Sequence, residues 1–169
     1  MHPTAMKHAK RFFNNYVNHK HDILEVGSQN VTGSLRDACP SCKSYVGIDM
    51  VAANGVDIVL TDPYKFPFED EKFDVVASSS VFEHSEMHWV LFLEMLRVMK
   101  PGGLMYMNAP SNGFVHRYPV DCWRFYPDAG KAFVTWAKYN KIECELLEEY
   151  IADAEGDVWN DFVMILRKK

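Results

Sequence analysis

Short apolar runs rich in valine and isoleucine alternate with segments of helical periodicity, and this alternation constrains the fold more than any other sequence feature. Buried parallel strands are predicted at 23–26, 45–49, 57–60, 73–77 and 104–108. A strand followed by a helix and then by another strand is the repeating unit of a parallel sheet. The sequence therefore predicts a doubly wound α/β architecture.

Three helical segments accompany these strands. The first twenty residues, 1–20, predict an N-terminal helix with an apolar side and a basic side. A second helix is predicted over about 87–99, where an apolar stripe ends at a proline and two glycines. A third is predicted over about 129–140, with Asp128 as its candidate N-cap.

Two apolar runs near the end of the chain, 143–150 and 160–167, are separated by acidic residues and are typical of an antiparallel pair. They complete a mostly parallel seven-stranded sheet with an antiparallel C-terminal strand. With 169 residues and 48% hydrophobic content, the chain is long enough for one buried core and too short for two ordinary domains. We therefore expect a single Rossmann-like domain over 1–169.

Charge and composition exclude several classes of protein. A net charge of -5 argues against general affinity for nucleic acid or for anionic membranes. No apolar stretch approaches the roughly 18 to 20 residues of a spanning helix, and the start of the chain lacks a signal-peptide pattern. We expect a cytoplasmic protein that acts on a small molecule; the oligomeric state is not indicated.

The residues at the ends of the early strands are candidates for a ligand site, because open parallel sheets bind ligands beyond the carboxyl ends of their strands. Gly27 follows the first strand and lets backbone approach a ligand closely, and Gly33 repeats this at the start of a following helix. Asp49 ends the second strand about twenty residues later, where a carboxylate can accept hydrogen bonds from ribose hydroxyls.

Nicotinamide dinucleotides fit this loop poorly. Their G-x-G-x-x-G fingerprint would require glycine at positions 29 and 32 after Gly27, where the chain has Gln29 and Thr32. Glu25, just before the turn, would repel a pyrophosphate but could attract an ammonium or sulfonium group. The sequence therefore disfavours a nicotinamide oxidoreductase.

The segment from Glu25 to Ser34, Glu-Val-Gly-Ser-Gln-Asn-Val-Thr-Gly-Ser, resembles class I S-adenosylmethionine-dependent methyltransferases, in the Methyltransf-11-like branch. The blocks 62–68, 78–84 and 96–103 are similar to further segments of that family. The resemblance implies S-adenosylmethionine as cofactor, with Asp62 near the adenine amine. The expected cofactor residues are Glu25, Gly27, Ser28, Gly33, Asp49, Met50, Asp62 and Ser78.

A long irregular segment, 109–127, joins the fifth strand to the next helix and is the predicted substrate loop, since loops of this length are usually functional. It combines hydrogen-bond donors, a carboxylate and flat aromatic surfaces, a mixture that recognises sugars and other polar molecules. The expected substrate residues are His116, Arg117, Tyr118, Asp121, Trp123 and Arg124. The alternative is that the aromatic residues pack the loop down while Arg117 or Arg124 pairs with Asp121.

Methyl transfer from a sulfonium needs orientation and desolvation more than it needs a base. Where the acceptor is a hydroxyl, His84 and His116 are the candidate catalytic bases. A metal site on a helical face with His84 and His88, beside Glu83 and Glu86, is conceivable, but the spacing departs from H-E-x-x-H. Cys39 and Cys42 lack the second pair that a four-thiolate zinc site requires, so no metal is expected.

These observations favour a methyltransferase that acts on a small polar acceptor, with a saccharide or another hydroxyl compound as the expected class. The alternative is a domain that binds S-adenosylmethionine, or regulates a partner, without turnover, because the first loop lacks the usual alternating glycines. Methylation of nucleic-acid bases is disfavoured, because Asp62-Pro-Tyr64 only partly imitates the Asp/Asn-Pro-Pro-Tyr/Phe block of such enzymes.

Overall fold

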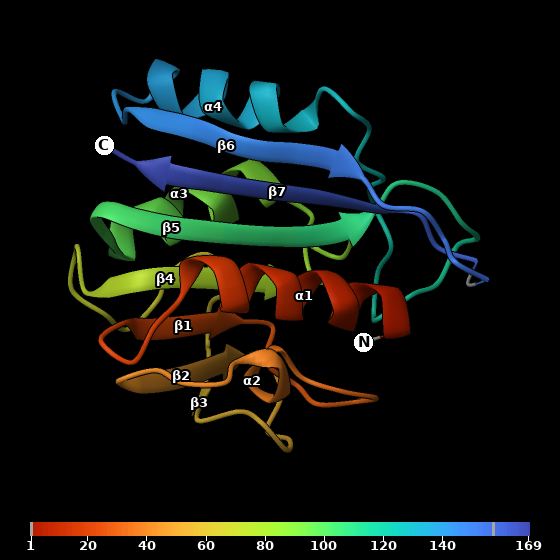
Figure 1. The fold of residues 1–169 in the computed structure, drawn as a ribbon, viewed down its shortest axis with the longest axis horizontal. Helices are drawn as coiled ribbons and strands as arrows, with labels where there is room; N and C mark the ends of the chain where they lie inside the picture. Colours follow the sequence, from red (N-terminus) through yellow and green to blue (C-terminus); the bar gives the residue numbers. More distant parts are fainter. Residues whose placement is uncertain (1, 157) are drawn as a thin grey trace.

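Seven strands of the described residues, 2–156 and 158–169 of a computed structural model, form one sheet (Figure 1). In sheet order, β3-β2-β1-β4-β5-β7-β6, only β7 runs antiparallel to its neighbours, which confirms the predicted mostly parallel sheet. The strands are β1 (Asp22–Val26), β2 (Ser44–Asp49), β3 (Ile58–Val59), β4 (Phe73–Ser79), β5 (Met99–Pro110), β6 (Cys144–Ile151) and β7 (Asp161–Lys168).

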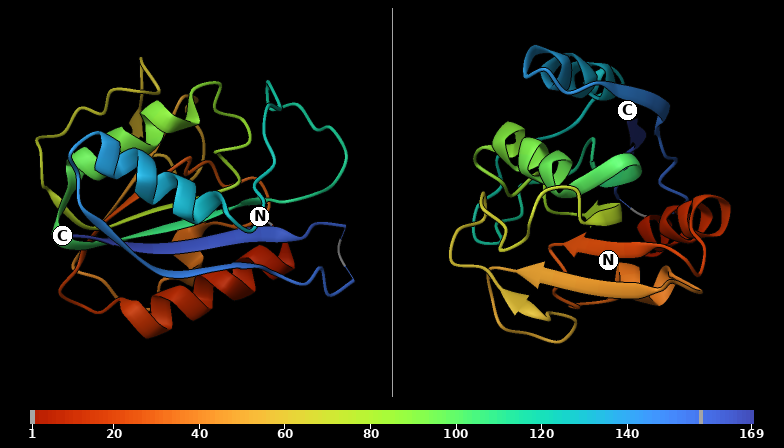
Figure 2. Two further views of the ribbon diagram at one scale, coloured as in Figure 1. Left: turned by 90° about the horizontal axis from the view of Figure 1, so that it is seen from above. Right: turned by 90° about the vertical axis from the view of Figure 1, so that its left-hand side faces the viewer.

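Helices cover both faces of this sheet, so the fold is the expected Rossmann-like α/β arrangement (Figure 2). One face carries α1 (Pro3–Tyr16) and α2 (Leu35–Ala38), and the other carries α3 (His88–Val98) and α4 (Ala129–Tyr139). Within the described residues, no helix is both long and apolar enough to cross a membrane.

The N-terminal helix α1 packs across the sheet through an aromatic contact. Pro3 stands in its first turn, where a missing N–H costs nothing. Phe12 is fully buried and stacks on Tyr106 of β5, with 4.8 Å between the ring centroids. The basic residues Lys7, Lys10 and Arg11 of the same helix are exposed, as the amphipathic pattern predicts.

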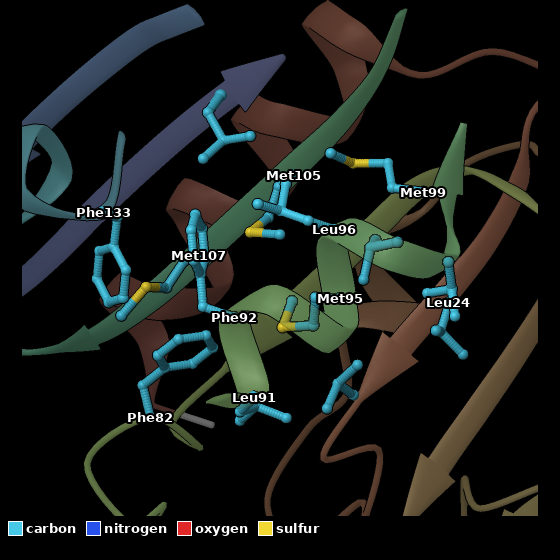
Figure 3. Packing of buried hydrophobic residues seen from close by; sticks show 14 of the residues in the cluster. Leu24, Phe82, Leu91, Phe92, Met95, Leu96, Met99, Met105, Met107 and Phe133 are labelled. Atoms are coloured by element: carbon cyan, nitrogen blue, oxygen red, sulfur yellow. The ribbon is translucent and has the colours of Figure 1, made fainter. Parts of the chain in front are cut away.

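The opposite face of the sheet holds the larger cluster of buried apolar side chains (Figure 3). Met95 and Leu96 of α3 pack on this face together with Met105 and Met107 of β5. Phe92 of α3 lies 4.7 Å from the ring of Phe133 on α4, so the two helices share one core. This packing fixes the start of α3, and with it the loop that leaves β4.

A turn segment without a helix connects β3 to β4. Arg97 of α3 holds it by donating to the carbonyls of Phe66 and Phe68 and to the carboxylate of Asp70, 2.7 Å away. Glu94 of α3 accepts the N–H of Phe66 at 2.6 Å. The edge strand β3 has only two residues, shorter than the predicted 57–60, because only Ile58 and Val59 pair with β2.

The prediction that the side chain of Asp128 caps α4 is wrong. Asp128 stands at the N-cap position, but its side chain makes no capping hydrogen bond. Its carboxylate pairs instead with Lys131, 2.9 Å away, one turn into the helix. β5 also runs longer than predicted, to Pro110, so the irregular loop begins at Ser111.

Replacing Phe12 with alanine should lower the free energy of unfolding by about 3 to 5 kcal/mol, because a fully buried ring leaves a cavity against Tyr106. Urea denaturation measures this change. The exposed neighbour Lys10 is the matched control, since Lys10→Ala should change stability by less than about 0.5 kcal/mol. Equal losses in the two variants would contradict the described packing of α1.

Candidate active site at the strand ends

Four adjacent strands end side by side at one edge of the sheet. In the order β3-β2-β1-β4, their ends are followed or occupied by Asp62, Asp49, Gly27 and Ser78. Between β1 and β4 the chain order of the sheet reverses, and ligands of such sheets bind at this switch point. The structure thus brings the predicted cofactor residues of four separate segments into one row.

Gly27 is the position in this row that only glycine can fill. Its φ is +79°, and a Cβ placed there would lie 2.0 Å from Cγ2 of Val81, in the loop that leaves β4. The N–H groups of Gly27 and Ser28 both donate to the carbonyl of Ile48, at 2.9 and 3.1 Å. The first loop is therefore drawn toward the end of β2 and lies directly against the loop after β4.

Asp49 ties this loop to the second strand. Its two carboxylate oxygens accept the N–H groups of Gln29 at 3.1 Å and of Val51 at 3.3 Å. A carboxylate oxygen can accept more than one hydrogen bond, so both keep capacity for a ligand hydroxyl. Met50 follows directly and is 44% exposed, which places an apolar side chain beside the carboxylate.

Two serines of the row are buried without a hydrogen-bond partner for their hydroxyl groups. Ser28 is 1% exposed, at the turn after β1, and Ser78 is fully buried in β4 beside Val26. Unpartnered buried polar atoms are uncommon and need a reason, which a ligand can supply.

Gly33, the other predicted glycine, has a positive φ of 133°, and its N–H donates to Asn30 Oδ1 at 2.9 Å.

Glu25 is placed differently from its neighbours in the row. Its buried carboxylate accepts the Tyr45 hydroxyl at 2.9 Å and the N–H of Leu35, the first residue of α2, at 3.3 Å. Burial raises the pKa of Glu25 to about 7, against the opposing effect of these two hydrogen bonds. Glu25 therefore anchors α2, and its direct contact with a cofactor stays a prediction.

Asp62 is exposed and begins the segment between β3 and β4. One of its oxygens accepts the N–H of Tyr64 at 2.8 Å, and this hydrogen bond closes a local turn at the start of the segment. The hydroxyl of Tyr64 in turn accepts the N–H of Met87, which precedes α3, at 3.1 Å.

An internal ion pair organises the loop between Ser111 and Asp128. Arg124 donates to both oxygens of Asp121, at 2.6 and 2.9 Å, and the Asp121 side chain is only 2% exposed. The hydrogen bonds from Arg124 hold the pKa of Asp121 well below its usual range. Of the two pairings that we considered, the structure shows the one with Arg124, so these two residues build the loop, while substrate contact by either stays a prediction.

The same loop reaches back over the strand ends, to their right in Figure 1. The hydroxyl of Tyr118 donates to Gln29 of the first loop at 3.0 Å. On the other side, Trp123 Nε1 donates to the carbonyl of Ser85 at 2.9 Å. The predicted substrate residues Tyr118 and Trp123 thus join this loop to both sides of the row, while Arg117 is exposed.

His84 and His116, the candidate bases, meet at this junction. Their rings pack edge to face with centroids 4.9 Å apart. Nδ1 of His84 lies 2.5 Å from the carbonyl of Val120, and burial lowers the pKa of His84. His88, the other histidine of the helical face considered above, packs instead against Trp123 and nearby phenylalanines, away from this pair.

The sequence places Glu83 only beside a conceivable metal face, and the structure makes it the most unusual carboxylate of the site. It is 1% exposed, and neither of its oxygens has a hydrogen-bond partner. Burial raises its pKa to about 8. Its carbonyl accepts the N–H groups of Cys122 at 2.7 Å and Trp123 at 3.2 Å, so Glu83 also joins the loop to the end of β4.

Comparison with known proteins shows the family of the chain. Residues 24–107 match a family model described as a methyltransferase domain. Phthiotriol/phenolphthiotriol dimycocerosates methyltransferase 1 of Mycobacterium ulcerans is 37% identical over 110 residues, covering 53% of this chain and 38% of that protein. The chain belongs to the S-adenosylmethionine-dependent methyltransferase family. It spans well under half the length of this curated relative.

Solved structures show the same fold as this methyltransferase domain. A Burkholderia thailandensis 1,6-didemethyltoxoflavin-N1-methyltransferase, bound to 1,6-didemethyltoxoflavin and S-adenosylhomocysteine, superposes with a TM-score of 0.69 at 11% identity, covering 98% of this chain and 78% of that one. The [4+2]-cyclase SpnF superposes with a TM-score of 0.71 at 14% identity, covering 96% and 79%. The fold therefore accommodates more than one reaction, and the site must decide which.

The buried Glu25 predicts a defined dependence of stability on pH. Its pKa rises from 4.5 to about 7 on folding, so between these values the folded methyltransferase holds a proton that the unfolded chain has lost. The free energy of unfolding should therefore fall by roughly 3 kcal/mol from this residue as pH rises through that window.

Urea denaturation between pH 4 and pH 8 should show a loss of stability that is smaller by this amount in Glu25→Gln, which keeps the shape of the side chain, while the part that comes from buried Glu83 remains. Glu69 is an exposed carboxylate, so Glu69→Gln should follow the wild-type curve. An unchanged pH slope in Glu25→Gln would show that Glu25 is not buried as described.

Proposed function

We propose that this domain binds S-adenosylmethionine along the row of strand ends and methylates a small polar acceptor under the loop 111–128. The observation that carries the proposal is the alignment of Gly27, Asp49 and Asp62 at three neighbouring strand ends, beside two buried serine hydroxyls without partners. The cofactor has the groups that this row can receive, namely ribose hydroxyls, an amino-acid end and an adenine amine. Family membership supports the same ligand.

Each part of the row has a separate task in this proposal. Asp49 accepts hydrogen bonds from the ribose, and Gly27 allows backbone to approach the amino-acid end. Asp62 stands at the β3 end of the row, where the family resemblance puts the adenine amine. Ser28 and Ser78 offer hydroxyl groups that the protein itself leaves unpaired.

S-adenosylmethionine supplies a methyl group on a positively charged sulfur, which keeps the electron pair of the broken bond when an acceptor atom takes the methyl group. The loop excludes water and orients the acceptor, through Tyr118 on one side and Trp123 on the other. His84 and His116 lie where the two loops meet, which favours a hydroxyl acceptor such as a saccharide. In this reading one of the two imidazoles takes up the hydroxyl proton.

Calorimetry with S-adenosylhomocysteine tests the cofactor site. Hydrogen bonds to a charged group contribute about 1.5 to 3 kcal/mol, so Asp49→Ala should weaken binding about 10- to 150-fold. Glu69→Ala, an exposed carboxylate beyond the row, should leave it unchanged. Equal affinities for wild type and Asp49→Ala, with both folded, would contradict the proposed site.

A methyl-transfer screen with labelled S-adenosylmethionine and hydroxyl acceptors then tests turnover. Transfer to a saccharide or another hydroxyl compound is the expected result. Tight binding of S-adenosylhomocysteine without transfer to any acceptor would favour a non-catalytic or partner-regulating domain. Binding of NADH in place of S-adenosylhomocysteine would favour an oxidoreductase and overturn the proposal.

A further inference from the structure

Three side chains with metal-binding atoms meet at the junction of the loop after β4 and the loop 111–128. One carboxylate oxygen of Glu83 and one ring nitrogen each of His84 and His116 lie within 4.8 Å of one another. Ligands of one divalent metal ion, bound at about 2.0 to 2.2 Å each, sit somewhat closer together than this. Tetrahedral ligands at these distances lie about 3.4 Å apart, so the widest of the three separations would shorten by up to about 1.4 Å on metal binding.

Glu83 provides an independent reason to expect a cation there. The Glu83 residue is only 1% exposed to solvent. Its Oε1 lies 3.7 Å from Nε2 of His84. Neither oxygen has a hydrogen-bond partner. A carboxylate in this environment is expensive to bury unless a cation or a donor compensates it, and buried charges in proteins are commonly paired or bound to metals.

Both histidines are held in place by hydrogen bonds. Nδ1 of His84 faces the carbonyl of Val120 at 2.5 Å, which leaves Nε2 for a ligand on the side of Glu83. His116 is held through its backbone N–H, which donates to Oδ2 of Asp121 at 2.7 Å, while its Nδ1 lies 3.3 Å from that oxygen and has no hydrogen-bond partner. A carbonyl behind the ring of His84 is a usual outer partner of a metal-binding histidine.

The surrounding charges also favour a cation. The charged groups that act on Glu83 are the carboxylates of Asp121 and Asp161 and the guanidinium of Arg124. With Glu83 ionised, three negative charges face one positive charge, and Arg124 is already paired with Asp121. Asp161 has partners of its own, His2 Nε2 at 3.2 Å and the Asn108 amide at 3.1 Å. Glu83 is therefore the carboxylate of the three that a bound cation would compensate.

We propose that Glu83, His84 and His116 bind a divalent first-row transition metal ion, with open coordination positions toward the cofactor row. Two imidazoles and one carboxylate suit zinc, manganese, iron or cobalt better than magnesium or calcium, which prefer oxygen ligands. The sequence analysis expected no metal because it weighed His84 with His88, whereas the fold brings His116 to this place from 32 residues further along the chain.

This site deepens the proposed function and rests on it for its role. Val81, which packs against Gly27, precedes Glu83 by two residues, so the metal site lies next to the switch point. A bound cation lowers the pKa of an acceptor hydroxyl in its open positions. With both imidazoles bound to the metal, the hydroxyl proton leaves to water instead of to a histidine. The oxygen then forms a bond to the methyl carbon while the sulfur keeps the electron pair of the broken S–C bond.

Cobalt(II) titration of the chelator-treated protein tests the site without requiring activity. The wild-type protein should bind one equivalent and develop the visible d–d absorption of a cobalt–imidazole complex. Glu83→Gln and His116→Ala should each weaken binding by at least about tenfold, as loss of a ligand does. His19→Ala removes an exposed histidine from another part of the chain and should bind like wild type.

The two proposals fail in different ways. Equal cobalt affinity in wild type, Glu83→Gln and His116→Ala, or no absorption in wild type, would overturn the metal site. If the metal site fails this test and S-adenosylhomocysteine still binds in the presence of EDTA, the cofactor proposal is retained and only the metal site is refuted. Cobalt binding without any S-adenosylhomocysteine binding would instead refute the proposed function and keep the site. Melting temperatures confirm folding, and the half-buried His116 serves as the second variant if Glu83→Gln unfolds.

Discussion

Parallel pairing of β1 with β2 on one side and with β4 on the other aligns the carboxyl ends of three strands, and this pairing determines everything else at the site. It brings Asp49 and Ser78 to either side of Gly27, although they are far apart in the chain. Because Gly27 has no side chain, Val81 can lie against it and the loops after β1 and β4 can touch. A side chain at this position would separate the two loops and open the row.

The strands and the position of the row followed from periodicity and spacing, since a buried parallel strand and a residue at its end are local features of a sequence. Contacts made by the loop 111–128 did not, because no period governs an irregular segment. The ion pair Asp121–Arg124, three residues apart, is one of the two pairings that the sequence allows. The contact of Tyr118 with Gln29, 89 residues away, depends on the finished fold and had no signal in the sequence.

Buried polar groups without partners mark where the domain departs from what stability alone would favour. Ser28, Ser78 and Glu83 all lie within or beside the row, and each would be less costly as an apolar residue of similar size. Glu25, in contrast, is paired with Tyr45 and with the start of α2. Its carboxylate therefore serves local structure, whereas the proposed ligand contacts fall on the unpaired groups of the row.

A crystal structure of the domain with S-adenosylhomocysteine tests this account most directly. We predict that the ribose lies on Asp49, that the backbone of Gly27 contacts the amino-acid end, and that the sulfur faces the junction of the loops at Glu83 and His84. A ligand bound at another edge of the sheet, or in the row without contact to Asp49, would contradict the central claim that the aligned strand ends form the cofactor site.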